Sequence, residues 1–212
     1  MPTDAASSIP YESENVRGFL HRAEGARHGL VLTHGAGGNC NAPVLVAMAS
    51  AFVAAGVSVL RCDLPFRQRR PTGPPSPATA AADRAGLQSA VEAMRGLVAG
   101  PIYLGGHSYG GRQASMLVAE NHGLVEALLL LSYPLHPPGK SAQLRTAHFP
   151  QLRTPAVFVH GTNDSFGSIA EMETALALIT SPVRLLPVEG AGHDLKRGRF
   201  DLASVVNALL GE

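Results

Sequence analysis

A serine stands at the centre of the run Gly106-His107-Ser108-Tyr109-Gly110, which has the pattern G-x-S-x-G. In this pattern the serine occupies a sharp turn between a strand and a helix, and the glycines let the two elements cross closely while the hydroxyl stays exposed. Five residues alone also fit an ordinary glycine-rich turn, so the choice between the two interpretations depends on the flanking segments. Residues 101–104 predict a strand before the serine, and residues 112–120 predict a helix after it. We therefore interpret Ser108 as a nucleophile.

A histidine and an aspartate further along the chain are the residue types that such a serine needs. A hydroxyl is a weak nucleophile until an imidazole takes its proton, and the imidazole needs a carboxylate that fixes its tautomer and stabilises its charged form. His193 stands in a glycine-rich stretch after the last predicted strand, and Asp164 follows another predicted strand. The chain order serine, aspartate, histidine accompanies this serine turn in known enzymes. We predict that His193 is the base and Asp164 its orienting acid.

Other carboxylates compete with Asp164 for this role. Asp164 itself could cap a helix that begins near residues 165–167, since aspartate is a favoured N-cap. Asp63, Asp194 and Asp201 are the remaining candidates, and Asp194 adjoins the histidine, so that its side chain would usually point away from the ring. We favour Asp164 because of its place after a strand and its place in the chain order.

Three further histidines, His34, His107 and His160, follow predicted strands and could reach the same edge of the sheet. A histidine at a strand end is more often a hydrogen-bonded structural residue than a ligand. The sequence offers no H-x-H or H-x-x-x-H pair that would support a zinc site. We therefore expect neither a metal nor a cofactor.

A second glycine-rich stretch, His34-Gly35-Ala36-Gly37-Gly38, ends a short apolar run at residues 29–33. Such a loop brings backbone N–H groups close to a ligand atom. A phosphate-binding loop would have lysine and serine or threonine after the last glycine, whereas this chain has Asn39-Cys40-Asn41. We predict an oxyanion hole made by the backbone N–H groups of Ala36 and Tyr109, which would stabilise a tetrahedral intermediate.

Two loops are predicted to line the substrate cleft. Residues 63–77 contain five prolines and are expected to form an irregular loop at the same end of the sheet, where Phe66 and Arg67 could line the cleft. Tyr133 follows the strand expected over residues 125–131, and we assign it with Phe66 to substrate binding. Residues 139–154 are too few for a large cap domain, so we expect an open site.

Apolar runs alternate with helical patterns along the chain, which predicts an α/β fold with a mostly parallel sheet of about six to seven strands and helices on both faces. The expected strands cover residues 16–22, 29–33, 57–62, 101–104, 125–131, 155–160 and 183–188. The expected helices cover residues 41–55, 78–99 (softened at Gly86 and Gly96), 112–120, 167–180 and 200–210. We expect residues 1–14 to be a loose N-terminal segment and residues 15–212 to form a single domain.

Composition narrows the classes of partner. Among 212 residues, 17 are Lys or Arg and 16 are Asp or Glu, so no excess of positive charge favours nucleic acid. The two cysteines, Cys40 and Cys62, form no metal-binding pattern and favour a reducing compartment. No secretory signal and no membrane-spanning run is visible, so we expect a cytoplasmic protein with a small-molecule acyl substrate. The sequence indicates no particular oligomeric state.

At the residues named above, the sequence resembles the α/β-hydrolase superfamily. The G-x-S-x-G run, the loop at residues 34–38, Asp164 and His193 match its motif order over nearly the whole chain. More narrowly, the sequence resembles the small cap-less branch similar to dienelactone hydrolases that includes the KANL/Tex hydrolase-like proteins. The stretches that carry this closer match are residues 34–38, 132–137 and 155–164.

Two functions fit these residues. The first is a serine hydrolase that cleaves a small carboxylic ester, or a related acyl compound, through an acyl-enzyme. The second is a catalytically silent, hydrolase-like binding or scaffold protein. Some members of the narrower branch are parts of larger assemblies. The intact set of nucleophile, base, acid and oxyanion loop favours the enzyme, and acyl transfer, peptidase and thioesterase activities stay open.

Overall fold

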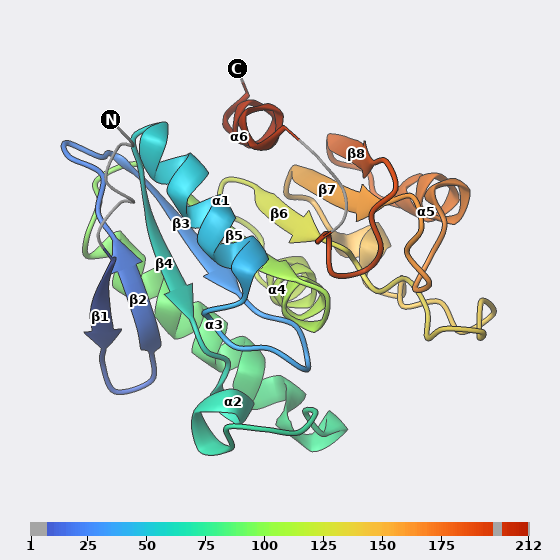
Figure 1. Cartoon of the computed structure of the whole chain (residues 1–212), viewed down its shortest axis with the longest axis horizontal. Coiled ribbons are helices and arrows are strands. Elements are labelled where there is room, and N and C mark those ends of the chain that lie inside the picture. Colours follow the sequence, from blue (N-terminus) through green and yellow to red (C-terminus); the bar gives the residue numbers. More distant parts are fainter. Residues whose placement is uncertain (1–7, 197–200, 212) are drawn as a thin grey trace.

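The centre of the protein is an eight-stranded sheet, seen in a computed structural model that describes residues 8–196 and 201–211 (Figure 1). The strand order is β1-β2-β4-β3-β5-β6-β7-β8. Strand β2 pairs antiparallel with both β1 and β4, and every other neighbouring pair is parallel. The strands are β1 (Ser8–Glu12), β2 (Arg17–His21), β3 (His28–Thr33), β4 (Val57–Cys62), β5 (Ile102–His107), β6 (Leu128–Leu131), β7 (Ala156–Gly161) and β8 (Val183–Val188).

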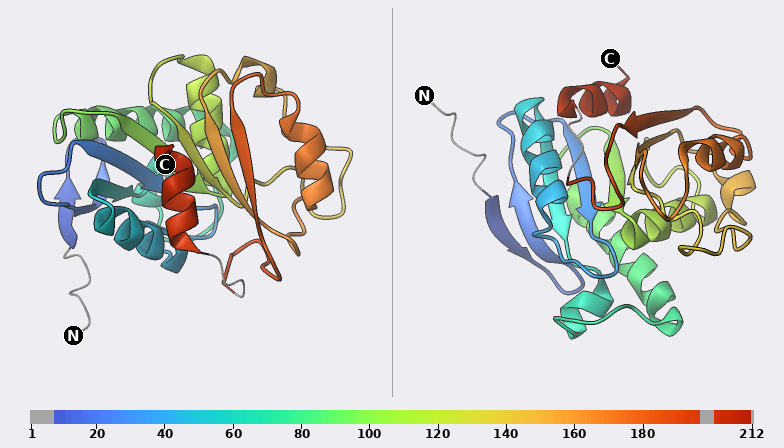
Figure 2. Two further views of the ribbon diagram at one scale, coloured as in Figure 1. Left: turned by 90° about the horizontal axis from the view of Figure 1, so that it is seen from above. Right: turned by 45° about the vertical axis from the view of Figure 1, so that its right-hand side comes forward.

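Helices cover both faces of this sheet, because the central strands are apolar on both sides (Figures 1 and 2). In β3, Leu30 and Leu32 pack in the core beneath α1 and α6, while Val31 points into the opposite core beneath α3, α4 and α5. The helices are α1 (Pro43–Ala54), α2 (Pro65–Arg69), α3 (Ala80–Arg95), α4 (Tyr109–Glu120), α5 (Ile169–Leu176) and α6 (Leu202–Leu210). The predicted α/β class, with its mostly parallel sheet and no large cap, is confirmed.

The N-terminal region differs from the prediction. Residues 8–12, expected to be part of a loose segment, form β1 and pair with β2 from Ser8 opposite His21 to Glu12 opposite Arg17. This strand lies at the edge of the sheet and is mostly exposed, so it tolerates Pro10 and shows no alternation of apolar residues. The strand is held by hydrogen bonds to β2, and no sequence pattern within residues 8–12 predicts this pairing.

The proline-rich segment also contains more regular structure than expected. Pro65 occupies the start of α2, where its fixed φ suits a helix and its missing N–H costs nothing. Gly86 lies inside α3 rather than interrupting it. Glycine is needed at this position because a Cβ would come within 2.5 Å of the Pro65 ring. Gly86 therefore allows α3 to pack against the start of α2, whereas Gly96 is the C-cap residue of α3.

The remaining helices agree with the prediction apart from their ends. The C-terminal helix begins at Leu202, after the N-cap residue Asp201, and the predicted start at Phe200 lies outside the described residues. Strand β6 is shorter than expected because residues 125–127 precede its ladder. None of the helices in the described ranges is long and apolar enough to cross a membrane.

Candidate active site

Ser108 occupies the abrupt turn between β5 and α4, with φ 51° and ψ −116°. A non-glycine residue with positive φ is strained, and such strain is common at functional sites. The flanking glycines make the turn possible. A Cβ on Gly106 would lie 2.7 Å from the carbonyl carbon of Gly110, and one on Gly110 would lie 2.5 Å from the His34 oxygen. Leu131, at the end of β6, accepts the Ser108 N–H at 2.8 Å and fixes the serine backbone.

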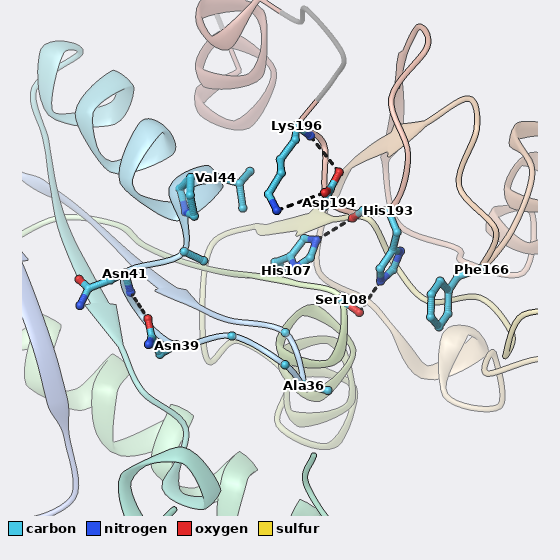
Figure 3. A pocket seen from close by; sticks show the side chains of 15 residues that line it. Ala36, Asn39, Asn41, Val44, His107, Ser108, Phe166, His193, Asp194 and Lys196 are labelled. Carbon is cyan, nitrogen blue, oxygen red and sulfur yellow. Dashed lines mark hydrogen bonds and ion pairs between the residues drawn. The ribbon is translucent and has the colours of Figure 1, made fainter. Parts of the chain in front are cut away.

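The structure brings Ser108, His193 and Asp164 into one chain of hydrogen bonds. His193 Nε2 lies 2.7 Å from Ser108 Oγ, as drawn in Figure 3, and His193 Nδ1 lies 2.8 Å from Asp164 Oδ2. The Asp164 side chain is fully buried and accepts the Phe166 N–H on Oδ1 at 2.8 Å. With the Nδ1 proton directed at this carboxylate, Nε2 is free to accept the serine proton.

The competing carboxylates are engaged elsewhere. Asp63 accepts the Cys40 N–H at 2.7 Å, Asp194 pairs with Lys196 on the surface at 3.4 Å, and Asp201 caps α6. Asp164 is not the cap of α5, because Ser168 fills that position in a reciprocal capping box with Glu171.

The other three histidines make structural hydrogen bonds. His34 donates from Nδ1 to Gly35 O and accepts the Leu64 N–H, and His160 donates to Gly167 O at 2.8 Å. His107 donates from Nε2 to the backbone oxygen of His193 at 2.8 Å (Figure 3). Burial lowers the pKa of all three rings and keeps them neutral. His107 thus holds the loop that carries His193.

Within the described ranges, no group of three or more His, Cys, Asp or Glu side chains could hold a metal ion.

Ala36 and Tyr109, the predicted oxyanion donors, line one cavity together with Ser108. Neither of their N–H groups donates to a protein acceptor among the described residues, and Tyr109 is the first residue of α4, where helix N–H groups have no partner within the helix. The macrodipole of α4 also favours negative charge at this end.

A buried arginine, Arg67 of α2, holds the glycine-rich loop in place. Its side chain donates to Gly38 O at 2.7 Å and to Ala36 O at 2.9 Å, and it also bonds the carbonyl oxygens of Arg70 and Gly73. The bonds to Gly38 and Ala36 fix the backbone of the loop on both sides of Gly37, directly beside Ala36. The sequence indicates Arg67 only as a lining residue, because the loop carbonyl groups of Ala36 and Gly38 that it bonds lie about 30 positions away in the chain.

Replacing Arg67 with methionine is expected to lower kcat by about 100-fold and to change KM little, because the loop that carries the predicted oxyanion donor Ala36 loses its support. Stability should fall by about 2–4 kcal/mol, since four backbone carbonyl groups lose a charged donor. Steady-state kinetics and thermal melting measure the two effects. Arg69→Met on the exposed side of the same helix is the matched control. An unchanged kcat in folded Arg67→Met would contradict this role.

Phe66 and Tyr133 do not line the site, which corrects their assignment to substrate binding. Each is 1% exposed. Phe66 packs between the rings of His34 and Tyr109, and Tyr133 packs on Phe149 and Phe158. Both are core residues because the chain folds back over them, and their positions in loops after strands gave no sign of this.

Two cavities open on either side of Ser108 and share Ala36, Ser108 and Phe166 as walls. One, of about 600 Å³, extends along the glycine-rich loop to Val44 and the Asp194–Lys196 pair (Figure 3). The other, of about 520 Å³, extends between residues 74–77 and the start of α4. Phe166, which sequence analysis missed, stacks on the His193 ring with the centroids 4.0 Å apart.

A mostly parallel sheet with a serine at the strand–helix turn, and with a histidine and an aspartate on later loops at the same edge, defines the class of α/β hydrolases. Residues 26–206 match the family described as "Alpha/beta hydrolase domain", and the chain belongs to this family.

Solved structures share this fold at low sequence identity. Dienelactone hydrolase from Anabaena variabilis is 20% identical, with a TM-score of 0.72 over 95% of this chain and 93% of that one. Est1E from Butyrivibrio proteoclasticus is 16% identical, with a TM-score of 0.71 over 95% of both chains. XC6422 from Xanthomonas campestris, described as an α/β serine hydrolase without a lid, is 15% identical, with a TM-score of 0.72 over 98% of this chain and 94% of that one.

Proposed function

We propose that this protein is a serine hydrolase that cleaves small carboxylic esters, or related acyl compounds, through an acyl-enzyme. The observation that carries the proposal is the chain of hydrogen bonds from Ser108 Oγ through His193 to the buried Asp164. Family membership supports hydrolysis in general. The two cavities beside Ser108 give room for the two halves of an ester.

The proposed reaction uses these residues in turn. Ser108 Oγ attacks the carbonyl carbon as His193 Nε2 takes its proton, and Asp164 stabilises the resulting imidazolium. The N–H groups of Ala36 and Tyr109 bind the oxyanion of the tetrahedral intermediate. Its collapse breaks the ester bond, and His193 returns the proton to the leaving alcohol. A water molecule, deprotonated by His193, then attacks the acyl-enzyme and releases the acid and Ser108.

A fluorophosphonate probe tests this proposal together with a panel of short p-nitrophenyl esters, thioesters, lactones and amides. We expect the probe to label Ser108, located by peptide mass spectrometry, and at least one class of acyl compound to be turned over. A chain that neither reacts with the probe nor turns over any of these compounds would instead be a hydrolase-like binding or scaffold protein.

We also propose that the protein works in a reducing compartment, the cytoplasm. Cys40 and Cys62 are both buried and unpaired. Burial raises the pKa of each thiol to about 12, so that both stay protonated at neutral pH. Both thiols should therefore react slowly with oxidants and act poorly as nucleophiles.

A further inference from the structure

The second cavity beside Ser108 carries an unusual charge. Arg112, in the first turn of α4, and Arg145, in the segment between β6 and β7, both line it, and we call it the arginine pocket. Among the described residues, no aspartate or glutamate lines it, and neither arginine forms an ion pair with a carboxylate.

The nearby acidic groups already have partners. Asp83 accepts the Tyr109 hydroxyl at 2.8 Å and the Phe66 N–H at 3.0 Å, and Glu120 pairs with Arg84 at 3.3 Å. The two pocket arginines therefore line one cavity without a counter-ion among the described residues. Burial first, and then the neighbouring Arg112 charge, lower the pKa of Arg145. Two uncompensated guanidinium groups at one cavity favour an anionic ligand.

Two polar atoms behind this wall lack hydrogen-bond partners in the described ranges. Arg112 Nε and Gln113 Nε2 are buried without a hydrogen-bond partner in the described part of the chain. Gln113 is held by Arg84, which donates to its Oε1 at 3.2 Å. Arg67 offers a contrast, because it is buried with its donors spread over four backbone carbonyls. Arg112 makes fewer contacts with the fold: its side chain hydrogen-bonds the Tyr133 hydroxyl, and its Nε lacks a partner among the described residues.

The two cavities also differ in the charge of the residues that line them. In the first cavity, Lys196 is neutralised by Asp194 (Figure 3). The arginine pocket has two cations and no anion, and the rest of its wall is largely apolar, with prolines at positions 74, 75, 77 and 134 and Met116. This wall suits a short apolar chain or ring that ends in an anionic group.

We propose that the arginine pocket binds the anionic end of the substrate, a carboxylate or phosphate carried on the acyl or alcohol part of the ester. This inference rests on the proposed function and deepens it, because the pocket shares Ala36 and Ser108 with the reacting centre. An anion held there would position the ester carbonyl at Ser108 Oγ. Guanidinium groups bind carboxylate and phosphate with the same two-point geometry, so the experiment must distinguish the two.

Matched esters test the pocket. On the acyl side, 4-nitrophenyl hydrogen adipate is compared with 4-nitrophenyl hexanoate, which has the same length and no charge. On the alcohol side, 4-acetoxybenzoate and 4-acetoxyphenyl phosphate are compared with phenyl acetate. We expect kcat/KM for an anionic ester to exceed that of its neutral match by tenfold or more in at least one set. The set and the anion that show the preference identify which part of the substrate enters the pocket.

Arg112→Gln and Arg145→Gln are each expected to lower the anionic-to-neutral ratio of kcat/KM by about 10- to 100-fold, the range for a lost charged hydrogen bond. Arg112→Lys, which keeps the charge, should retain part of the ratio. Arg69→Gln, exposed on α2, is the control and should leave the ratio at its wild-type value. Thermal melting verifies that each variant is folded.

Failure of this proposal differs from failure of the proposed function. Turnover of neutral esters without a preference for anionic ones, or equal losses on both in the arginine variants, would overturn the pocket assignment alone. Absence of both turnover and fluorophosphonate labelling would overturn the hydrolase and the pocket together. Calorimetric binding of adipate to Ser108→Ala, weakened by Arg112→Gln, would support the pocket without relying on turnover.

Discussion

Ser108→Ala is expected to abolish ester turnover, with kcat falling by roughly 10⁶-fold. The serine oxygen is the atom that would form the acyl-enzyme, and nothing else at the turn can replace it. The proposed oxyanion donors, the N–H groups of Ala36 and Tyr109, stay in place, so a residual rate of about 10³ over the uncatalysed reaction is expected. Alanine should also keep the fold, although φ 51° strains any side chain at this position.

Initial rates on short p-nitrophenyl esters, with fluorophosphonate labelling as the second readout, measure this effect. Ser132→Ala is the matched control. Ser132 also has a positive φ, of 48°, at the end of the neighbouring strand β6, and its buried Oγ has no hydrogen-bond partner in the described ranges. Its replacement should leave the rate within about threefold. Substantial turnover by Ser108→Ala would show that the nucleophile lies elsewhere.

The sequence allowed the positions of Ser108, Asp164 and His193 to be predicted because their local constraints are strong. Gly106 and Gly110 are required by close backbone contacts at the serine turn, and those contacts lie within a few residues or on the adjacent strand. The other two residues follow strands of a parallel sheet, and loops after such strands meet at one edge. The three residues could therefore be predicted from the spacing of the motif and the order of the strands.

The surroundings of the site were less predictable because long-range packing decides them. Phe66 is an aromatic residue in a segment that follows a strand, as a cleft residue would be, yet it packs between the rings of His34 and Tyr109. Arg67, its neighbour, points to the glycine-rich loop instead. The arginine pocket joins Arg112 and Arg145, which are 33 positions apart and belong to no shared motif. A linear pattern cannot show which charges lack a counter-ion after folding.

Asp164→Asn is expected to lower kcat by about 10⁴-fold at neutral pH, through the tautomer of His193. The Phe166 N–H donates to Oδ1 of Asp164, so the amide oxygen of an asparagine would take this position. The amide NH₂ would then face His193 Nδ1 in place of Oδ2, which lies 2.8 Å away in the native protein. Two donors cannot face each other, so Nδ1 would lose its proton and Nε2 would carry one toward Ser108. The imidazole could then no longer accept the serine proton.

A control and a competing outcome make this prediction specific. Asp201→Asn changes another of the carboxylates considered from the sequence, and asparagine is an equally good N-cap for α6, so its rate and stability should stay near those of the wild type. Rates of ester hydrolysis and of Ser108 labelling should fall together in Asp164→Asn, because both need the same proton acceptor. If Asp194→Asn lost more activity than Asp164→Asn, the carboxylate that orients His193 would be misassigned, even though Asp194 faces Lys196 at the surface.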